Sequence, residues 1–222
     1  MTQSEVGGFT PALGRPELTQ DYDRVIAIMT RERRWRGALV ALMAPGEHDR
    51  IVDVGCGTGT LAIQLKQRAP GAQMIGLDPD EAVLSLAREK AAREEIVVDW
   101  RRCHGDQAVA ELGPEVATMV VSSLVLHQCP MPMKLAILKN MYTLLEPGGR
   151  FYVADYGLQR TFLMKQLFRQ VQMLDGFENT KPNAKGVLID LMVEAGFVDA
   201  SEAKVVQTPT GSISLYTGSR LF

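Results

Sequence analysis

Three glycines stand at positions 55, 57 and 59 directly after an apolar run, in the stretch IVDVGCGTGTLA that covers residues 51–62. Glycine weakens strand and helix interiors, so three of them in five positions need a reason. A glycine-rich turn between a strand and a helix lets a ligand touch the backbone, and the helix start behind it offers free N–H groups. The stretch therefore predicts a binding site for a nucleotide-like molecule.

The spacing and one acidic residue separate two classes of ligand. A dinucleotide loop follows the pattern G-x-G-x-x-G, whereas this chain has G-x-G-x-G, with Thr60 where the third glycine is wanted. Asp53 lies inside the apolar run just before the loop. Its carboxylate would repel a pyrophosphate and attract a ligand that carries an ammonium and a sulfonium. These residues favour S-adenosylmethionine over a dinucleotide.

Further polar residues follow the next two apolar runs. Asp78 ends the run IGLD, 21 residues after Gly57, where an acidic residue usually hydrogen-bonds ribose hydroxyls. A helix-capping role is the alternative for Asp78, but Asp80 fits that role better. Asp106 and Gln107 follow the third run, and together they can accept from and donate to an adenine edge.

Strands and helices must alternate to bring these residues together. We expect strands at 51–54, 74–77, 97–102, 116–122 and 151–154, and helices at 22–43, 60–68, 80–93 and 133–145. This alternation predicts βαβ units and a parallel sheet with helices on both faces. After residue 155 we expect a helix at 161–174, a loop over DGFENTKPN at 175–183, a helix capped by Asn183 and closed by Gly196, and an antiparallel hairpin of 200–207 with 212–219.

Composition narrows the class of protein. The 222 residues suit one sizeable core, and the net charge of −2 gives no electrostatic reason for a nucleic-acid partner. We interpret RERRWR, at 31–36, as a solvated helix face. We find no signal peptide and no apolar run near the ~18 residues of a membrane span. Cys56, Cys103 and Cys129 form neither a disulfide framework nor a metal site, which indicates a reducing cytoplasm and no metal.

Four stretches carry a family resemblance. VDVGCGTG, GLDPDEAVLSLAR, GDQA and LLEPGGRFYVAD, in this order and spacing, resemble the class I S-adenosylmethionine-dependent methyltransferases over roughly residues 22–155. Within that class, YDRV…RRWR is similar to the ubiquinone/menaquinone biosynthesis methyltransferases. The resemblance implies an α/β fold: a single Rossmann-like domain over 22–222 with a seven-stranded, mostly parallel sheet, helices on both faces and a C-terminal antiparallel hairpin. We expect residues 1–21 to be a mobile segment.

The resemblance also assigns cofactor contacts. Carried over by position, Gly55 and Gly57 line the methionine part, Asp78 the ribose, and Asp106 with Gln107 the adenine. Tyr22 is expected to close over the cofactor. The remaining positions that we expect beside S-adenosylmethionine are Asp53, Cys56, Thr58, Pro79 and Ser123.

Methyl transfer from a sulfonium needs an aligned nucleophile, excluded water and, for a weakly acidic acceptor, a base. His127 lies just beyond the strand at 116–122, near the expected methyl group, and histidine can take a proton near neutrality. Asp155 and Tyr22 are the other catalytic candidates. The resembled quinone group has an arginine at the place of His127, so this departure argues against a quinone-type acceptor.

The segment 157–183 is not needed to form the expected sheet or its connections, and insertions of this kind commonly cover a substrate. We expect a helical substrate cover there, with an apolar lining suited to an aromatic or lipophilic acceptor: Phe162, Met164, Phe168 and Met173.

The leading hypothesis is a small-molecule methyltransferase, monomeric or homodimeric, with O- or C-transfer undecided. The chain lacks an N-P-P-Y or D-P-P-Y tetrapeptide after the fourth strand, which argues against methylation of nucleic-acid amino groups. Two alternatives stay open. One is a catalytically silent S-adenosylmethionine-binding scaffold, and the other is a nicotinamide oxidoreductase.

Overall fold

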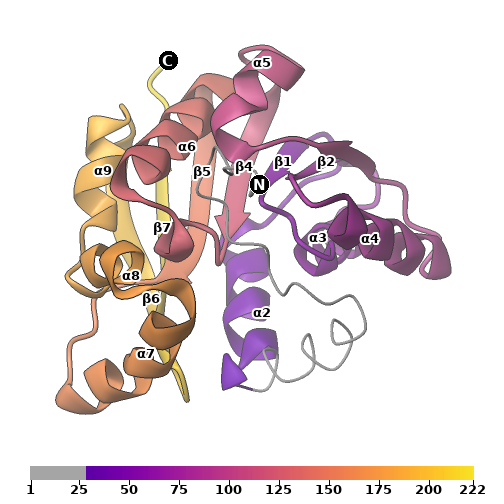
Figure 1. Ribbon diagram of the computed structural model, residues 1–222. Coiled ribbons are helices and arrows are strands. Elements are labelled where there is room, and N and C mark those ends of the chain that lie inside the picture. The colour runs from indigo at the N-terminus through magenta and orange to yellow at the C-terminus, as the bar shows by residue number, and fades with distance from the viewer. Residues whose placement is uncertain (1–28) are drawn as a thin grey trace, which may run out of the picture.

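Seven strands form one sheet in the order β3-β2-β1-β4-β5-β7-β6 (Figure 1). The computed structural model describes residues 29–222 of the chain. Strands β1 to β5 run parallel, and β7 is antiparallel to both β5 and β6. The predicted mostly parallel sheet with a C-terminal antiparallel hairpin is confirmed. The strands are β1 (Arg50–Val54), β2 (Gln73–Asp78), β3 (Asp99–Arg102), β4 (Ala117–Ser123), β5 (Leu145–Tyr156), β6 (Val198–Thr208) and β7 (Gly211–Ser219).

Helices cover both faces of the sheet, as predicted (Figure 1). Apolar side chains of α5, α6 and α9 pack on one face, and those of α2, α3 and α7 pack on the other. The helices are α2 (Glu32–Met43), α3 (Thr60–Arg68), α4 (Glu81–Arg93), α5 (Ala108–Leu112), α6 (Met131–Leu144), α7 (Phe162–Asp175), α8 (Phe177–Ala184) and α9 (Leu188–Glu194). Two 3-10 turns, η2 (Gly105–Gln107) and η3 (Leu126–Gln128), follow β3 and β4.

The boundaries around the glycine loop agree with the local sequence signals. α3 begins at Thr60 and ends at Arg68, as predicted. The side chain of Asp80 accepts a hydrogen bond from the backbone N–H of Ala82 at 2.9 Å, which confirms it as the N-cap of α4. The predicted mobile segment 1–21 and the first part of the predicted helix 22–43 lie outside the described residues.

The loop predicted over DGFENTKPN is wrong, because most of this stretch forms α8. The turn-like dipeptides and Pro182 pointed to a loop, but contacts distant in sequence hold the helix. Asn179 donates to the carbonyl of Gln128 at 2.9 Å, and Asn183 donates to that of Tyr156 at 3.0 Å. Asn183 is therefore an anchor within α8 and not the cap of the next helix, which begins at Leu188.

The strand order places the site. Connections run in opposite directions from β1 and β4, which are neighbours, so the sheet has its switch point between them. Ligands of open α/β sheets bind in the crevice outside the carboxyl ends of strands at such a point. The carboxyl ends of β1, β2, β4 and β5 carry, in that order, the glycine loop, Asp78, Ser123 and Asp155.

Candidate functional site

The three glycines of the loop serve two different purposes. All three have positive φ, a conformation that suits glycine. A Cβ on Gly55 would lie 2.3 Å from Val125, and one on Gly59 would lie 2.5 Å from Trp100, so these two let the protein pack against itself. A Cβ on Gly57 would meet no atom of the described residues within 4 Å. Gly57 is the glycine whose backbone stays open to a ligand.

Asp53 is a buried carboxyl group in need of a partner. It is fully buried, and neither of its carboxylate oxygens has a hydrogen-bond partner among the described residues. Burial raises its pKa from 3.8 to about 7, although the charge of Arg36 opposes that rise and the charge of Asp78 adds to it. An unpartnered buried carboxylate is costly. A ligand that brings a cation to this position would supply the missing partner.

Arg36 corrects the interpretation of RERRWR as a plain solvated face. Its side chain is mostly buried, forms an ion pair with Glu32 and lies 4.8 Å from the ring centroid of Trp35. Its charge reaches Asp53. Arg33 and Arg34, by contrast, are exposed, so the prediction holds for them. Arg36 lies over the ring of Trp35, which is buried. The tryptophan inside the basic run was the sequence signal that part of this run is not exposed.

Asp78 connects the loop to the end of β2. Its Oδ2 accepts from the backbone N–H of Gly57 at 3.0 Å, and its Oδ1 accepts from that of Asp80 at 3.0 Å. Burial raises its pKa, and these two hydrogen bonds counteract part of the rise. A carboxylate offers about four lone-pair sites, so acceptor capacity remains for hydroxyl groups of a ligand. Asp78 both orients the glycine loop and faces its ligand side.

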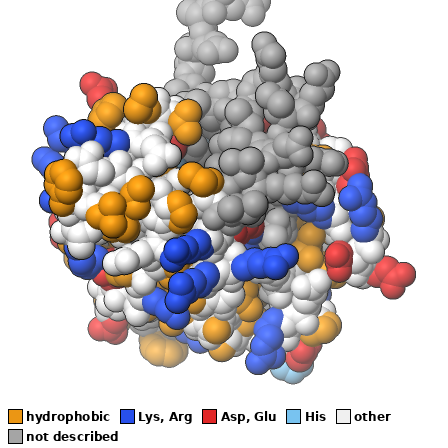
Figure 2. All heavy atoms as spheres, turned by 90° about the horizontal axis from the view of Figure 1, so that it is seen from below, with side chains coloured by type: hydrophobic (Ala, Val, Ile, Leu, Met, Phe, Trp, Pro, Cys, Tyr) orange, Lys and Arg blue, Asp and Glu red, His pale blue; other side chains and the backbone are white. Residues whose placement is uncertain are grey.

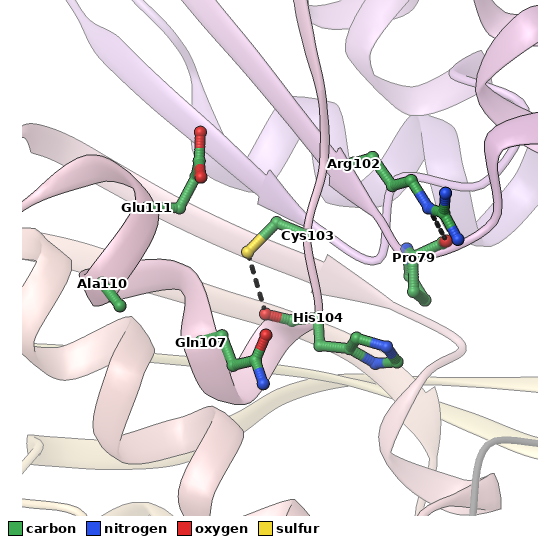
Figure 3. A pocket seen from close by; sticks show the side chains of 7 residues that line it. All are labelled: Pro79, Arg102, Cys103, His104, Gln107, Ala110 and Glu111. Carbon is green, nitrogen blue, oxygen red and sulfur yellow. Dashed lines mark hydrogen bonds between the residues drawn. The ribbon is translucent and has the colours of Figure 1, made fainter. Parts of the chain in front are cut away.

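A cavity of about 340 Å³ lies at the end of β3, and its lining begins at Pro79, the residue after Asp78. Figure 3 shows Gln107, Ala110 and Glu111 on one side of it, and Pro79 and Arg102 on the other. Its lining consists of Pro79, Arg102, Cys103, His104, Gln107, Ala110 and Glu111. Two predicted cofactor residues, Pro79 and Gln107, thus share one cavity, whereas Asp53 and Gly57 lie outside its lining.

A side chain of α6 holds the loop that carries Asp106. Asn140 donates to the backbone carbonyl of Asp106 at 2.8 Å and accepts from the backbone N–H of Val109 at 2.9 Å. Sequence reasoning missed Asn140, because its partners lie more than thirty residues away in the chain. The predicted adenine-binding loop is therefore positioned by a side chain of α6.

The other predicted cofactor residues have diverse surroundings. Cys56 is buried, and burial raises the pKa of its thiol far above the ordinary range, so it is an inert packing residue. The hydroxyl of Thr58 accepts from Nζ of Lys90 at 2.6 Å, which ties the loop to α4. Ser123 is half-buried at the end of β4. Tyr22 lies outside the described residues.

Asp155 is fully engaged by the protein itself. Its Oδ2 accepts from the backbone N–H groups of Leu126 at 2.7 Å and His127 at 3.3 Å. Its Oδ1 accepts from the backbone N–H of Tyr156 at 2.7 Å and contacts Nδ1 of His127 at 2.8 Å. Four donors on two oxygens leave it little capacity for a substrate. Asp155 instead fixes η3 to the end of β5.

His127 is held between two carboxylates. While Nδ1 contacts Asp155, Nε2 lies 3.3 Å from Oδ2 of Asp175 at the end of α7. Burial would lower its pKa, but the charge and hydrogen bond of Asp155, followed by those of Asp175, outweigh burial and raise the pKa to about 9. At neutral pH the ring is an imidazolium with both nitrogens occupied. It has no lone pair to accept a proton, so this geometry does not support the role of general base.

Residues 51–149 match the family model described as a methyltransferase domain. The match takes in fewer than half of the chain's residues, so it shows that this stretch is similar to methyltransferase domains. It begins at β1, contains the glycine loop, Asp78 and the loop of Asp106, and ends inside β5. The predicted resemblance to the class I S-adenosylmethionine-dependent methyltransferases is confirmed.

Curated proteins similar to this chain include quinone-biosynthesis enzymes. The chain is 32% identical over 142 residues to the demethylmenaquinone methyltransferase of Thermus thermophilus, a match that covers 63% of each chain. It is 29% identical over 137 residues to the ubiquinone/menaquinone biosynthesis C-methyltransferase of Dinoroseobacter shibae, covering 59% of this chain and 54% of that one. The chain therefore spans less than two thirds of the length of these relatives.

Solved structures show the same fold. An S-adenosylmethionine-dependent methyltransferase of Thermotoga maritima superimposes with a TM-score of 0.69 at 20% identity, over 92% of this chain and 97% of that one. A phosphoethanolamine N-methyltransferase of Haemonchus contortus, solved with S-adenosylmethionine bound, gives a TM-score of 0.73 at 16% identity, over 96% of this chain and 59% of that one. The methyltransferase fold thus extends beyond residues 51–149 to the hairpin.

Residues 29–222 contain neither a metal-binding cluster nor a membrane-spanning helix. In this range no cluster of three or more histidine, cysteine or acidic side chains is arranged to hold a metal ion. None of its helices has the length and apolar character that crossing a membrane requires.

The imidazolium of His127 predicts a pH-dependent stability of the protein. A folded-state pKa above the unfolded value gives stability that is complete below about pH 6.5 and is lost as the pH rises through about 9. A rise from 6.5 to about 9 corresponds to roughly 3 kcal/mol. The free energy of unfolding, measured with urea between pH 6 and 10, should fall by about this amount relative to His127→Gln.

The comparison with the variant is needed because a second group titrates nearby. Burial lowers the pKa of Lys134 to about 8, against the opposing charges of Asp155 and Cys129, and this gives a slope of opposite sign. Subtracting the His127→Gln profile isolates the histidine. Parallel profiles of wild type and variant across this range would show that His127 is neutral and would restore the general-base interpretation.

Proposed function

We propose that this protein transfers a methyl group from S-adenosylmethionine to a small-molecule acceptor. The observation that carries the proposal is the fully buried carboxyl of Asp53, which has no hydrogen-bond partner among residues 29–222, together with the open space on the Cβ side of Gly57. S-adenosylmethionine has an ammonium that can pair with Asp53 and a narrow amino-acid chain that can pass over Gly57. A dinucleotide would bring phosphates to the same carboxylate, which repels them.

The residues of the site fit the whole cofactor. Asp53 would hold the ammonium of the cofactor's amino-acid end, and Arg36, whose charge lowers the pKa of Asp53, would pair with the cofactor's carboxylate. Asp78 would accept from the ribose hydroxyls with its remaining lone pairs. Pro79 and Gln107 would enclose the adenine in their shared cavity, with Asp106 beside it. When bound, the cofactor supplies a methyl group on a sulfonium, which is a strong electrophile.

We infer that the protein contributes binding, orientation and exclusion of water more than proton transfer. His127 and Asp155 are occupied with each other and with the backbone. They act as positioning residues that hold η3 beside the end of β4. Tyr22 stays a predicted catalytic and cofactor-closing residue. Acceptors that are already anionic, or that react through an electron-rich carbon, need no strong base and suit this site best.

The acceptor class is inferred from two observations. Two curated relatives carry names of quinone-biosynthesis methyltransferases, whose acceptors are aromatic and lipophilic. The segment 157–183 forms helices α7 and α8 near η3, and Met164, Phe168 and Val171 on the inner face of α7 are buried. We propose that α7 and α8 cover an aromatic or lipophilic acceptor. O-transfer and C-transfer both fit.

Isotope transfer tests the proposed function. Purified protein is incubated with S-adenosylmethionine labelled in its methyl group and a panel of hydroxylated and quinol-type aromatic compounds, and formation of S-adenosylhomocysteine is measured. We expect turnover with at least one acceptor and none with Gly57→Val. Tight binding of S-adenosylhomocysteine without turnover on any acceptor would favour the silent scaffold.

The free thiols of all three cysteines support a reducing cytoplasm as the compartment.

Asp78 provides a graded test of the ribose contact. Asp78→Ala removes a charged hydrogen-bond acceptor from the ligand and from the N–H of Gly57, so affinity for S-adenosylhomocysteine should fall roughly ten- to a hundredfold. Asp80→Ala is the matched control, because Asp80 caps α4 and should alter the melting temperature but not the affinity. Equal affinities of the two variants, measured by calorimetric titration, would reduce Asp78 to a loop anchor.

A further inference from the structure

Helix α7 buries one apolar face, and four large apolar side chains elsewhere on the helix are exposed. Met164, Phe168 and Val171 form the inner face against the sheet. Phe162 and Met173 lie on the opposite side of the helix, each 77% exposed. Both were predicted to line the substrate cover, whereas their side chains are exposed to solvent on α7. The outward position of two large apolar side chains needs its own explanation.

The exposed apolar side chains continue along α7 into α8. Five of them, 52 to 77% exposed, form what we call the outer apolar surface: Phe162, Leu163, Met173, Leu174 and Phe177. Figure 2 shows hydrophobic side chains gathered on the side of the molecule where α7 and α8 lie, next to a group of Lys and Arg side chains. Single exposed apolar residues are common, but a gathered group usually marks an interaction site.

The charges around this surface are mainly positive. Lys165 and Arg169 are exposed along one edge of α7, and Lys181 and Lys185 are exposed on and just after α8. Of the two carboxylates in the same stretch, Asp175 contacts the imidazolium of His127, which leaves Glu178 as the other. The chain as a whole has a net charge of −2, so this cationic border is a local feature.

We propose that the outer apolar surface of α7 and α8 docks on the surface of a bilayer that contains anionic lipid. Apolar side chains that project from a helix, flanked by lysine and arginine, suit insertion at the boundary of headgroups and acyl chains. Each cation near an anionic leaflet adds favourable electrostatic energy. The docking does not depend on the methyl-transfer proposal, although it would bring a lipophilic acceptor to the helices that cover the site.

Charge argues for the bilayer over a second copy of the chain. A symmetric dimer through this surface would bring the same cationic border from both copies together, and like charges in contact oppose association. A bilayer with anionic headgroups reverses the sign of that interaction.

Co-sedimentation with vesicles tests the proposal. The full chain is mixed with vesicles of phosphatidylcholine alone, or with vesicles in which a quarter of the lipid is phosphatidylglycerol. We expect binding to the anionic vesicles that weakens with added salt, and much weaker binding to the neutral ones. Phe162→Ser with Met173→Ser should lower the partition coefficient at least tenfold, and Lys165→Glu with Arg169→Glu should lower it by roughly thirtyfold.

Val97→Ser is the control, because Val97 is 82% exposed in the connection before β3, far from α7 in the sequence. It should bind as the wild type does. Failure of the wild type to bind anionic vesicles, or wild-type binding by both double variants, would overturn the proposal. A dimer in sedimentation velocity that dissociates in the Phe162→Ser, Met173→Ser variant would also overturn it and assign the surface to a second copy.

Discussion

Gly57→Val should abolish binding of S-adenosylhomocysteine while the protein stays folded. The new side chain would project into the open space over the loop, where no described atom lies within 4 Å. We expect affinity to fall more than roughly a hundredfold, or about 2.7 kcal/mol. The rise in melting temperature that a native-state ligand produces would be lost with it. The positive φ of Gly57 adds strain of about 1–2 kcal/mol for a side chain, which a folded domain tolerates.

Gly113→Val controls for that strain. Gly113 also has positive φ and open space around a would-be Cβ, but it closes α5 and lies outside the glycine loop. This variant should lose stability and keep its response to S-adenosylhomocysteine. A Gly57→Val protein that binds as the wild type does would remove the loop from the cofactor site.

Asp53→Asn should stabilise the ligand-free protein and weaken its binding of S-adenosylhomocysteine. Asp53 has a folded-state pKa of about 7, above its ordinary 3.8. Its stabilising contribution is complete below about pH 4 and is lost as the pH rises through 7, so the ionised group is a burden above neutrality. The rise corresponds to at most about 4 kcal/mol. At pH 8 the variant should therefore have the larger free energy of unfolding.

Binding should change in the opposite direction. The ionised carboxylate is the form that attracts an ammonium, so wild-type affinity should decline as the pH falls below about 7. The affinity of Asp53→Asn should be roughly ten- to a hundredfold lower at pH 8 and should lack this pH dependence. Asp190→Asn, an exposed substitution on α9, is the control and should change neither quantity. A variant that is destabilised but binds normally would make Asp53 a structural residue.

Much of the fold was predictable because its signals are local. Glycine and proline punctuation, the cap at Asp80 and the alternation of apolar runs located the strands and most helices from β1 to β5, although α5 was not predicted and β5 begins at Leu145 instead of residue 151. α8 escaped prediction because its anchors, Asn179 and Asn183, bond to η3 and to β5, which are far away in the sequence. A local pattern cannot include partners that only the tertiary fold supplies.

Some features of the site could likewise be predicted from local sequence, and others could not. Asp53, Gly57 and Asp78 follow directly from strand ends and loop spacing, and the structure brings them together. The chemistry of His127 did not follow, because its protonation depends on Asp155 and Asp175, which lie 28 and 48 residues further along the chain. A Cβ added to two of the three glycines would meet Val125 and Trp100, which loop spacing did not indicate. Proximity to a strand end predicts location better than it predicts ionisation.

Calorimetric titration of the full chain with S-adenosylhomocysteine, beside a titration with NADH, tests the central claim most directly. The arrangement of Asp53, Gly57 and Asp78 predicts a single site for S-adenosylhomocysteine, with an affinity that declines below about pH 7. It predicts no heat of binding for NADH, whose pyrophosphate would face the carboxylate of Asp53. Saturable binding of NADH without binding of S-adenosylhomocysteine would contradict the account.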